Sequence, residues 1–203
     1  MRRRSRSFRD DDDQEFQRAQ QEMHGFVRGH FQRQRDVYFF DQTGISQQPC
    51  VPYGWTPPQQ TLEIPSRPSV RMNVLGFWSP ETDFFWREHF GSVNSQVVVD
   101  VFDAFCETLT RDVIVILDNA PVHTSHRFRS QRERWEAQGL EVYHLPTYSP
   151  ELNWIERLWK QLKYQWIPLW AYQSVDTLFQ EVKLILDHIG RVFRLNVQRE
   201  KFA

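Results

Sequence analysis

The sequence has few cysteines and no long hydrophobic run. Its two cysteines, Cys50 and Cys106, lie far apart and lack the spacing of a metal site, so a disulfide-stabilised scaffold is excluded and a reducing compartment, the cytoplasm, is expected. The longest unbroken apolar run is Val113–Leu117, far below the ~20 residues that cross a bilayer. No apolar segment follows the basic stretch Met1–Arg9, so we expect neither export nor a membrane anchor.

The chain also has almost no net charge. Its 25 Lys and Arg residues stand against 26 Asp and Glu residues, so no bulk positive charge attracts nucleic acid or a membrane, and such a partner must be bound by a local patch. The 203 residues are 40% hydrophobic, with 16 Phe and 8 Trp. This composition excludes disordered, collagen-like and coiled-coil classes and predicts one large domain with a short extension.

The expected extension comprises residues 1–36. It begins with five arginines among its first nine residues, continues with Asp10–Asp13 and becomes rich in glutamine. This pattern predicts a polar tail, in part disordered, that leads into a loose helix, and the alternative is an arginine-rich arm that touches nucleic acid. The main domain is predicted at 37–190 and a C-terminal tail at 191–203.

Alternating strand-like and helix-like patterns in the main domain predict an α/β fold. Strands are expected at 37–40, 55–58, 61–64, 72–78, 113–117 and 140–145, with an antiparallel meander of three strands before residue 79 and a parallel central strand at 113–117. Helices are expected at 94–109, 124–138, 150–166 and 174–189, the second of them exposed and basic. Asn94 or Ser95, and Ser149 followed by Pro150, are the expected helix starts.

Three acidic residues lie at or beside the ends of apolar elements. Asp41 directly follows the first strand, and Asp118 ends the strand at 113–117, where a parallel sheet presents its ligand-binding residues. Glu156 borders the apolar stripe of the helix at 150–166. Partly buried carboxylates that converge would repel one another, and Mg²⁺ or Mn²⁺ would relieve this repulsion. Two such ions about 4 Å apart can support phosphodiester cleavage.

Each acid taken alone has a simpler explanation. Asp118 could cap a turn, and Asp41 could begin one. Glu156 could form an ordinary surface pair with Lys160, four residues later on the same helix. The pattern alone therefore leaves the metal site open.

Three sequence blocks, at 38–44 (YFFDQTG), 116–123 (ILDNAPVH) and 145–156 (LPTYSPELNWIE), carry a resemblance to a known family. In order and spacing they resemble the catalytic domain of DDE transposases of the Tc/mariner superfamily, closest to its bacterial insertion-sequence branch. The resemblance implies a ribonuclease H-like fold with a mixed central sheet and helices on both faces. It also implies a bacterial cytoplasmic protein.

The resemblance assigns roles to the same acids. It implies that Asp41, Asp118 and Glu156 are the catalytic metal ligands, with Asn119 and His123 shaping the site. The implied reaction uses Mg²⁺ or Mn²⁺, two ions in all, to hydrolyse DNA at transposon ends and to join the freed ends to target DNA. Because residues 1–36 are too short for helix-turn-helix modules, an upstream helix-turn-helix part is an expected partner, and the active form is expected to be a dimer.

DNA contacts are expected from basic residues near the triad. They are Arg127, Arg129, Arg132 and Arg134 on one helix, and Arg157, Lys160 and Lys163 on another. The alternative function is a catalytically silent transposase fragment that only binds DNA or a partner chain.

Overall fold

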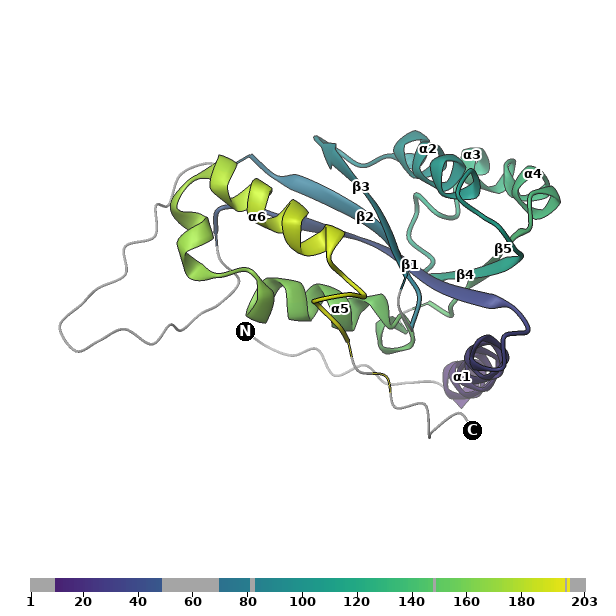
Figure 1. Cartoon of the computed structure of the whole chain (residues 1–203). Helices are drawn as coiled ribbons and strands as arrows, with labels where there is room; N and C mark the ends of the chain where they lie inside the picture. The colour runs from purple at the N-terminus through teal and green to yellow at the C-terminus, as the bar shows by residue number, and fades with distance from the viewer. Residues whose placement is uncertain (1–9, 49–69, 81–82, 148, 196, 198–203) are drawn as a thin grey trace.

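The computed structural model describes residues 10–48, 70–80, 83–147, 149–195 and 197. These residues form a five-stranded mixed sheet of order β3-β2-β1-β4-β5 with helices on both faces (Figure 1), which confirms the predicted architecture. The strands are β1 (Asp36–Ile45), β2 (Met72–Trp78), β3 (Phe84–Phe90), β4 (Val113–Leu117) and β5 (Leu140–His144).

Six α-helices occur in the described part of the chain, together with three short 3₁₀ or π segments. The helices are α1 (Asp10–Phe31), α2 (Ser95–Cys106), α3 (His126–Arg129), α4 (Arg132–Ala137), α5 (Ile155–Gln161) and α6 (Val175–Asp187). The turns are the 3₁₀ segments η1 (Pro150–Leu152) and η3 (Leu169–Gln173) and the π segment η2 (Leu162–Trp166). None of the helices that the structure describes has the length and apolar character needed to cross a membrane.

Strand β1 is the centre of the sheet and pairs differently with its two neighbours. It runs parallel to β4 from Asp36 to Phe39 and antiparallel to β2 from Phe39 to Ile45. Asp41 therefore lies just past the last residue of β1 that pairs with β4. Since Asp118 directly follows β4, these two carboxylates lie at the same end of the parallel pair.

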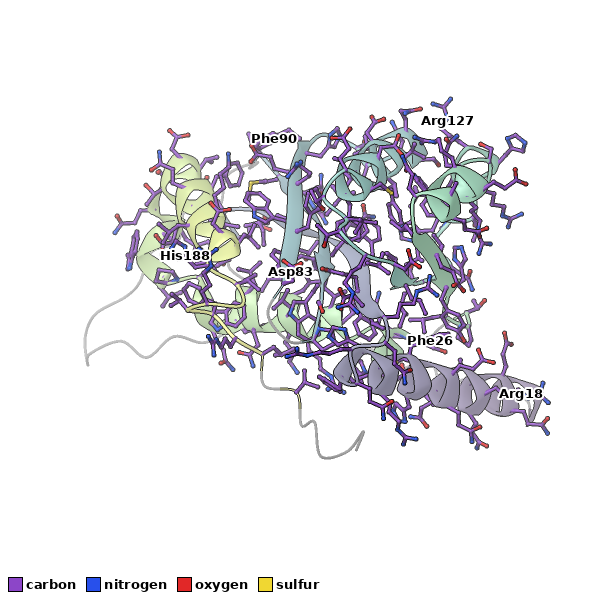
Figure 2. The ribbon with its side chains drawn as sticks, turned by 45° about the vertical axis from the view of Figure 1, so that its right-hand side comes forward. Arg18, Phe26, Asp83, Phe90, Arg127 and His188 are labelled. Carbon is purple, nitrogen blue, oxygen red and sulfur yellow. The ribbon has the colours of Figure 1, made fainter. Side chains whose placement is uncertain are left out.

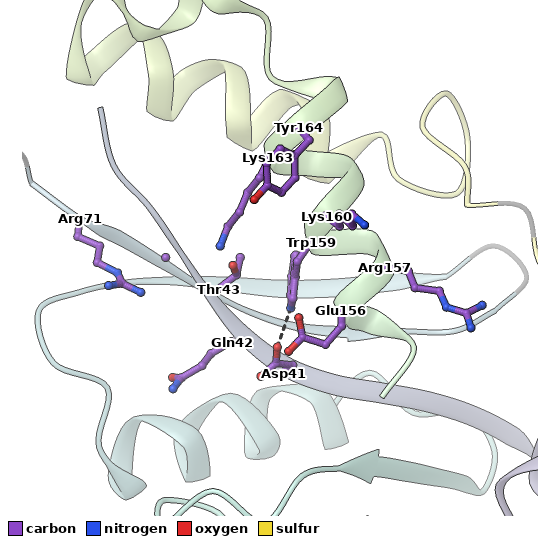
Figure 3. A pocket seen from close by; sticks show the side chains of 11 residues that line it. Asp41, Gln42, Thr43, Arg71, Glu156, Arg157, Trp159, Lys160, Lys163 and Tyr164 are labelled. Atoms are coloured by element: carbon purple, nitrogen blue, oxygen red, sulfur yellow. Dashed lines mark hydrogen bonds between the residues drawn. The ribbon is translucent and has the colours of Figure 1, made fainter. Parts of the chain in front are cut away.

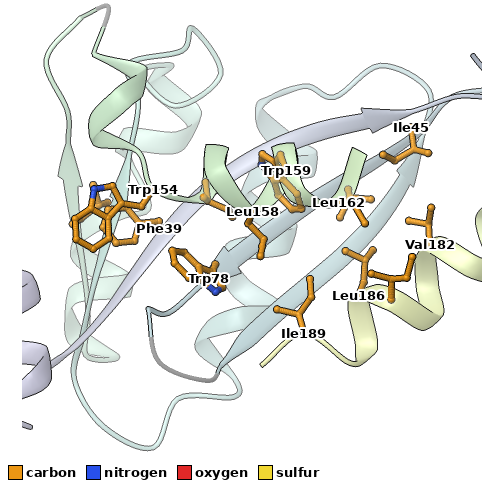
Figure 4. Close-up of a cluster of buried hydrophobic side chains, with 14 of the residues drawn as sticks. Phe39, Ile45, Trp78, Trp154, Leu158, Trp159, Leu162, Val182, Leu186 and Ile189 are labelled. Atoms are coloured by element: carbon orange, nitrogen blue, oxygen red, sulfur yellow. The ribbon is translucent and has the colours of Figure 1, made fainter. Parts of the chain in front are cut away.

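Alternation along β1 separates two hydrophobic cores. Phe39 packs in a cluster with residues of α1, α5 and α6, and Figure 4 shows it stacked beside Trp154 at a ring distance of 5.2 Å. Phe40 points to the other face, among residues of α2, α3 and α4. Each buried phenylalanine stabilises the fold by about 1.5–3 kcal/mol, so β1 is held from both sides next to Asp41.

The N-terminal helix is packed more tightly than its polar sequence predicted. In α1, Ala19, Met23 and Val27 recur every four residues and are buried against the sheet. Phe26 meets the ring of Tyr143 edge to face at 5.1 Å (Figure 2). The prediction of a loose, solvated helix was therefore wrong for this segment, because a narrow apolar stripe lies within its Gln- and Arg-rich sequence.

The predicted helix at 124–138 is divided in two. Helix α3 begins with the Ser125 side chain accepting the Phe128 amide, and α4 follows after a break at Ser130 and Gln131. Phe128 and Trp135 are fully buried in the core under α2. The expected exposed, basic helix is thus wrong in part, because these two aromatic side chains pack inward. Gly139, with φ of 88°, ends the segment as expected.

The predicted helix at 150–166 is also interrupted. Pro150 begins only a short 3₁₀ turn, and the Ser149 side chain caps nothing, contrary to the prediction. Asn153 has extended backbone angles, and α5 starts after it. The chain then widens into the π segment η2, where the Ile167 amide donates to the Leu162 carbonyl at 3.1 Å.

Other predicted elements are confirmed or lie outside the residues that the structure describes. Asn94 caps α2 and Ser174 caps α6, each through a side-chain oxygen. The meander is present, but its third strand is β3, an edge strand that the sequence analysis missed. The predicted strands at 55–58 and 61–64 fall outside the described residues.

Candidate active site

Asp41 has an unfavourable place for a charged group. Its side chain projects from β1 toward α5, and its pKa is raised from 3.8 to about 8. Burial is the largest cause, followed by the negative charge of Glu156 and a smaller effect of Asp118, while hydrogen bonds from the Gln42 amide and the Trp159 indole act in the opposite direction. A cation placed beside this carboxylate would stabilise its charged form.

Asp118, in contrast to Asp41, is stabilised in its charged form. His123 donates from Nδ1 to Asp118 Oδ1 at 2.8 Å, and this hydrogen bond holds the pKa of Asp118 below its ordinary value. The Ala120 amide donates to the same oxygen at 3.1 Å, so Asp118 also closes the turn after β4. About half of its side-chain surface is exposed, so a charged carboxylate is available at the strand end.

His123 is fixed by its surroundings. The ring is buried between Phe40 and Phe128, with ring centres 5.5 and 6.0 Å away. Its Nε2 has no hydrogen-bond partner among the described residues. Nδ1 is therefore the atom through which this ring acts, and it orients Asp118.

Glu156 occupies the first turn of α5 and is exposed. Partial desolvation raises its pKa, Lys163 lowers it, and Asp118 raises it. Figure 3 shows its carboxyl group directed toward Asp41. Within the described residues Glu156 forms no ion pair with Lys160, so the simple surface-pair explanation is wrong.

Two asparagines connect the segments that carry these acids. Asn119 donates from its side-chain amide to the Leu145 carbonyl at 2.6 Å, which joins the ends of β4 and β5. Asn153 is buried and donates to the Phe40 carbonyl at 2.9 Å, which joins the start of α5 to β1. The sequence analysis predicted a site-shaping role for Asn119 but missed Asn153.

A pocket of about 590 Å³ opens between β1 and α5 (Figure 3). Its acidic wall comprises Asp41 and Glu156, whereas Asp118 does not line it. The remaining lining residues are Gln42, Thr43, Gly44, Arg71, Arg157, Trp159, Lys160, Lys163 and Tyr164. The pocket thus combines two carboxylates with several cationic side chains, an arrangement suited to a metal ion together with a phosphate-bearing ligand.

The predicted basic residues divide between two places. Arg157, Lys160 and Lys163 all line the pocket, although Figure 3 shows Arg157 extending away from Asp41. The four arginines of α3 and α4 do not line it. Three of those arginines have protein partners: Arg127 bonds Gln96, Arg134 bonds Asp103, and Arg132 bonds the Val142 carbonyl.

Arg129 and Arg132 nevertheless lie near the other side of the triad. Their charges lower the pKa of His144, although burial is the larger cause. His144 in turn lies with Nδ1 3.4 Å from the Asp118 carbonyl oxygen. Arg127 instead lies at the edge of the molecule (Figure 2) and bonds Gln96 on α2.

The three acids influence one another electrostatically but do not close into a compact cluster. Among the residues that the structure describes, no group of three or more His, Cys, Asp and Glu side chains could hold a metal ion. The donors at the site are carboxylate oxygens, the type that Mg²⁺ and Mn²⁺ prefer. Burial and the nearby charges of Glu156 and Asp118 disfavour the charged form of Asp41, and a divalent cation would balance that charge.

Arg71 and Trp159 are site residues that the sequence analysis did not assign. The Arg71 guanidinium packs over Gly44, where an added Cβ would lie 1.9 Å from Nε. Arg71 follows a part of the chain in which no motif was found, so nothing in the sequence indicated it. Trp159 lines the same pocket and donates a hydrogen bond to Asp41, and the sequence analysis gave it no role there.

A family model described as DDE superfamily endonuclease matches residues 36–179. No curated protein matches the chain.

Several solved structures have a similar fold. The Mos1 transposase paired-end complex with left transposon end is 16% identical, with a TM-score of 0.55 over 92% of this chain and 59% of that chain. The Mos1 strand transfer complex is 18% identical, with a TM-score of 0.54 over 96% and 59% of the two chains.

A chain of the simian T-cell lymphotropic virus intasome, in complex with PP2A regulatory subunit B56 gamma, is 14% identical. Its TM-score is 0.52 over 80% of this chain and 50% of that chain. At such identities the likeness shows the fold, which is the ribonuclease H-like fold that the sequence predicted. The present chain spans only 50 to 59% of these three relatives.

Proposed function

Because this chain belongs to the DDE superfamily of endonucleases, we propose that it is the catalytic domain of a transposase of the Tc/mariner type. It would cleave DNA phosphodiesters at transposon ends and join those ends to target DNA. The observation that carries this proposal is the pocket between β1 and α5, where Asp41 and Glu156 face each other beside cationic side chains.

Asp41, Asp118 and Glu156 are the proposed metal ligands and catalytic residues. They come from the middle of the sheet, the end of β4 and the first turn of α5; Glu156 and Asp118 both raise the pKa of Asp41, and Asp118 also raises the pKa of Glu156. Two Mg²⁺ or Mn²⁺ ions held there would supply an activated hydroxyl and stabilise the leaving oxygen. His123 would keep Asp118 ionised and oriented, and Asn119 would hold the turn after β4.

The basic side chains would hold the DNA backbone. Lys160 and Lys163 line the pocket, and Lys163 also lies close enough to lower the pKa of Glu156. Arg157 and the arginines of α3 and α4 would contact phosphates farther along the duplex. Each phosphate contact should add about 0.9 to the slope of log affinity against log salt, so a flat salt response would contradict this assignment.

The DNA partner would be transposon ends and target DNA. Both Mos1 matches are transposition complexes by name, one a paired-end complex with left transposon end and one a strand transfer complex. We propose a dimer as the active form. A helix-turn-helix part would supply sequence-specific recognition of the ends, because the described residues contain no such module beside the sheet domain.

Nicking of supercoiled plasmid DNA tests the proposal. The full chain should nick DNA with Mg²⁺ or Mn²⁺ and lose this activity in a chelator. Asp118→Asn and Glu156→Gln should each abolish nicking with little change in melting temperature. Glu151→Gln is the matched control, because Glu151 is an exposed acid that does not line the pocket.

The competing function is a silent fragment that binds DNA or a partner chain without cutting. The absence of a closed three-ligand cluster among the described residues is the observation in its favour. A chain that binds DNA but shows no nicking with either metal would support this alternative, whereas metal-dependent nicking that Asp118→Asn removes would exclude it.

A further inference from the structure

Helix α5 is fastened to β1 on both sides of Glu156. Two residues before α5 begins, Asn153 donates to the Phe40 carbonyl at 2.9 Å. One turn after Glu156, Trp159 donates from Nε1 to Asp41 Oδ2 at 3.1 Å (Figure 3). Glu156 and Trp159 are three residues apart on α5 and are therefore neighbours on its surface.

The indole ring of Trp159 has little freedom to move. It is buried, and its ring lies edge to face against Phe84 at 6.0 Å. Beneath it lies Gly76, which is the partner of Asp41 in the β1–β2 register. A Cβ at Gly76 would come within 2.9 Å of the Trp159 ring and 2.8 Å of the Phe84 ring, so the missing side chain leaves the space that the indole occupies.

We propose that Trp159 is a positioning residue that holds the Asp41 carboxylate toward Glu156 before a metal ion binds. Because its indole N–H belongs to the helix that carries Glu156, it sets the separation of two carboxylates that come from different elements. Asn153, on the other side of Glu156, also fixes this separation, because it binds the carbonyl of Phe40, the residue before Asp41. This inference rests on the proposed function, since it concerns ligands of the proposed metal site.

A purely structural role predicts something different. If Trp159 only filled the core, replacing it by Phe would lower stability and leave metal affinity unchanged. As a residue that orients a ligand, it should affect metal affinity by about 10- to 100-fold when its hydrogen bond is removed. The two roles are therefore separable by a binding measurement.

The experiment measures Mn²⁺ binding to the full chain by electron paramagnetic resonance, at a temperature below the melting point of each variant. Trp159→Phe keeps an aromatic ring and removes the N–H, and we expect Mn²⁺ to bind at least about tenfold more weakly. Trp135→Phe is the matched control. Trp135 is fully buried and donates its indole N–H to Asp103 at 2.7 Å, but it lies under α2, in the other core.

We expect Trp135→Phe to bind Mn²⁺ within twofold of the unchanged chain. Equal affinity for the unchanged chain and Trp159→Phe would overturn the proposal while leaving the proposed function intact. No Mn²⁺ binding by the unchanged chain would instead overturn the proposed function, and this inference with it.

A second readout does not depend on how well Trp159→Phe folds. In a proton–nitrogen correlation spectrum the Trp159 indole signal should move when Asp41 is replaced by Ala, which removes the acceptor, and when Mg²⁺ is added. The Trp135 signal should stay in place in both cases. A Trp159 signal that is unmoved by the Asp41→Ala change would show that the contact is absent in solution and would overturn the proposal.

Discussion

Replacing Asp41 by Asn should stabilise the protein at alkaline pH when no metal is present. The reason is the raised pKa of the Asp41 carboxyl, which burial and the charge of Glu156 move from 3.8 to about 8. Between these two values the folded protein keeps a proton that the unfolded chain has released. The free energy of unfolding therefore falls as pH rises through this window. Asparagine has no charge to bury and can still accept the hydrogen bond from Trp159.

The size of the effect follows from the same two values. Each pKa unit corresponds to about 1.4 kcal/mol, so a shift from 3.8 to about 8 costs on the order of 5 kcal/mol once pH exceeds 8. At pH 5 most of that cost is absent, and the advantage of Asn shrinks to about 1–2 kcal/mol. For a chain of this size 1 kcal/mol changes the melting temperature by about 2–4 °C, so Asp41→Asn should melt on the order of 10 °C higher at pH 8.5.

Thermal melts of the two proteins in chelator at pH 5 and pH 8.5 measure this difference. Adding Mg²⁺ should then raise the melting temperature of the unchanged chain and leave Asp41→Asn nearly where it was. A difference in melting temperature between the two proteins that is the same at both pH values would refute the reasoning, because it would mean that Asp41 is not a desolvated carboxylate.

Three further changes test other contacts of the site. His123→Phe removes the hydrogen-bond donor that lowers the pKa of Asp118. As the pH is lowered, this variant should therefore lose Mn²⁺ binding at a higher pH than the unchanged chain does. Loss of binding at the same pH in both proteins would contradict the role of His123. Lys163→Ala removes the charge that lowers the pKa of Glu156. The pH below which nicking activity is lost should therefore also rise. An equal loss of nicking rate at all pH values would indicate that Lys163 only contacts phosphate. Gly76→Ala should raise the Mn²⁺ concentration for half-saturation several-fold by displacing the indole above it, and unchanged affinity would show that the ring can yield without cost.

The strands and caps were predictable where the pattern was locally strong. The continuous apolar run of β4 predicted a buried parallel strand, and the structure confirms it. Asn94 was a recognisable helix start because its side chain acts within its own turn. In contrast, β3 lies at the edge of the sheet with Arg87 and Glu88 exposed, so it lacks the apolar alternation that marks a strand.

The helix breaks could not be predicted because distant contacts cause them. Asn153 interrupts the segment after Pro150 by donating its side chain to Phe40, a residue 113 positions earlier in the chain. The fold also decides that Phe128 and Trp135 both turn inward from α3 and α4. Neither contact leaves a signal within its own stretch of sequence.

The candidate site also combines residues that local sequence predicts with contacts that only the fold creates. Asp41, Asp118 and Glu156 were predicted because each ends or borders an apolar element, and the structure sets Asp41 and Glu156 across one pocket. The partners that hold them are long-range. Trp159 reaches Asp41 only because Gly76, on a neighbouring strand, leaves room for its ring.

The most direct test of the proposed metal site is a crystal structure of the chain soaked in Mn²⁺, with anomalous scattering used to locate the metal. We predict anomalous peaks bridging the carboxylates of Asp41, Asp118 and Glu156, with the Trp159 indole still bonded to Asp41. An ordered site without a peak, with carboxylates more than about 10 Å apart, could not share two ions spaced about 4 Å and would contradict metal-dependent cleavage by these residues.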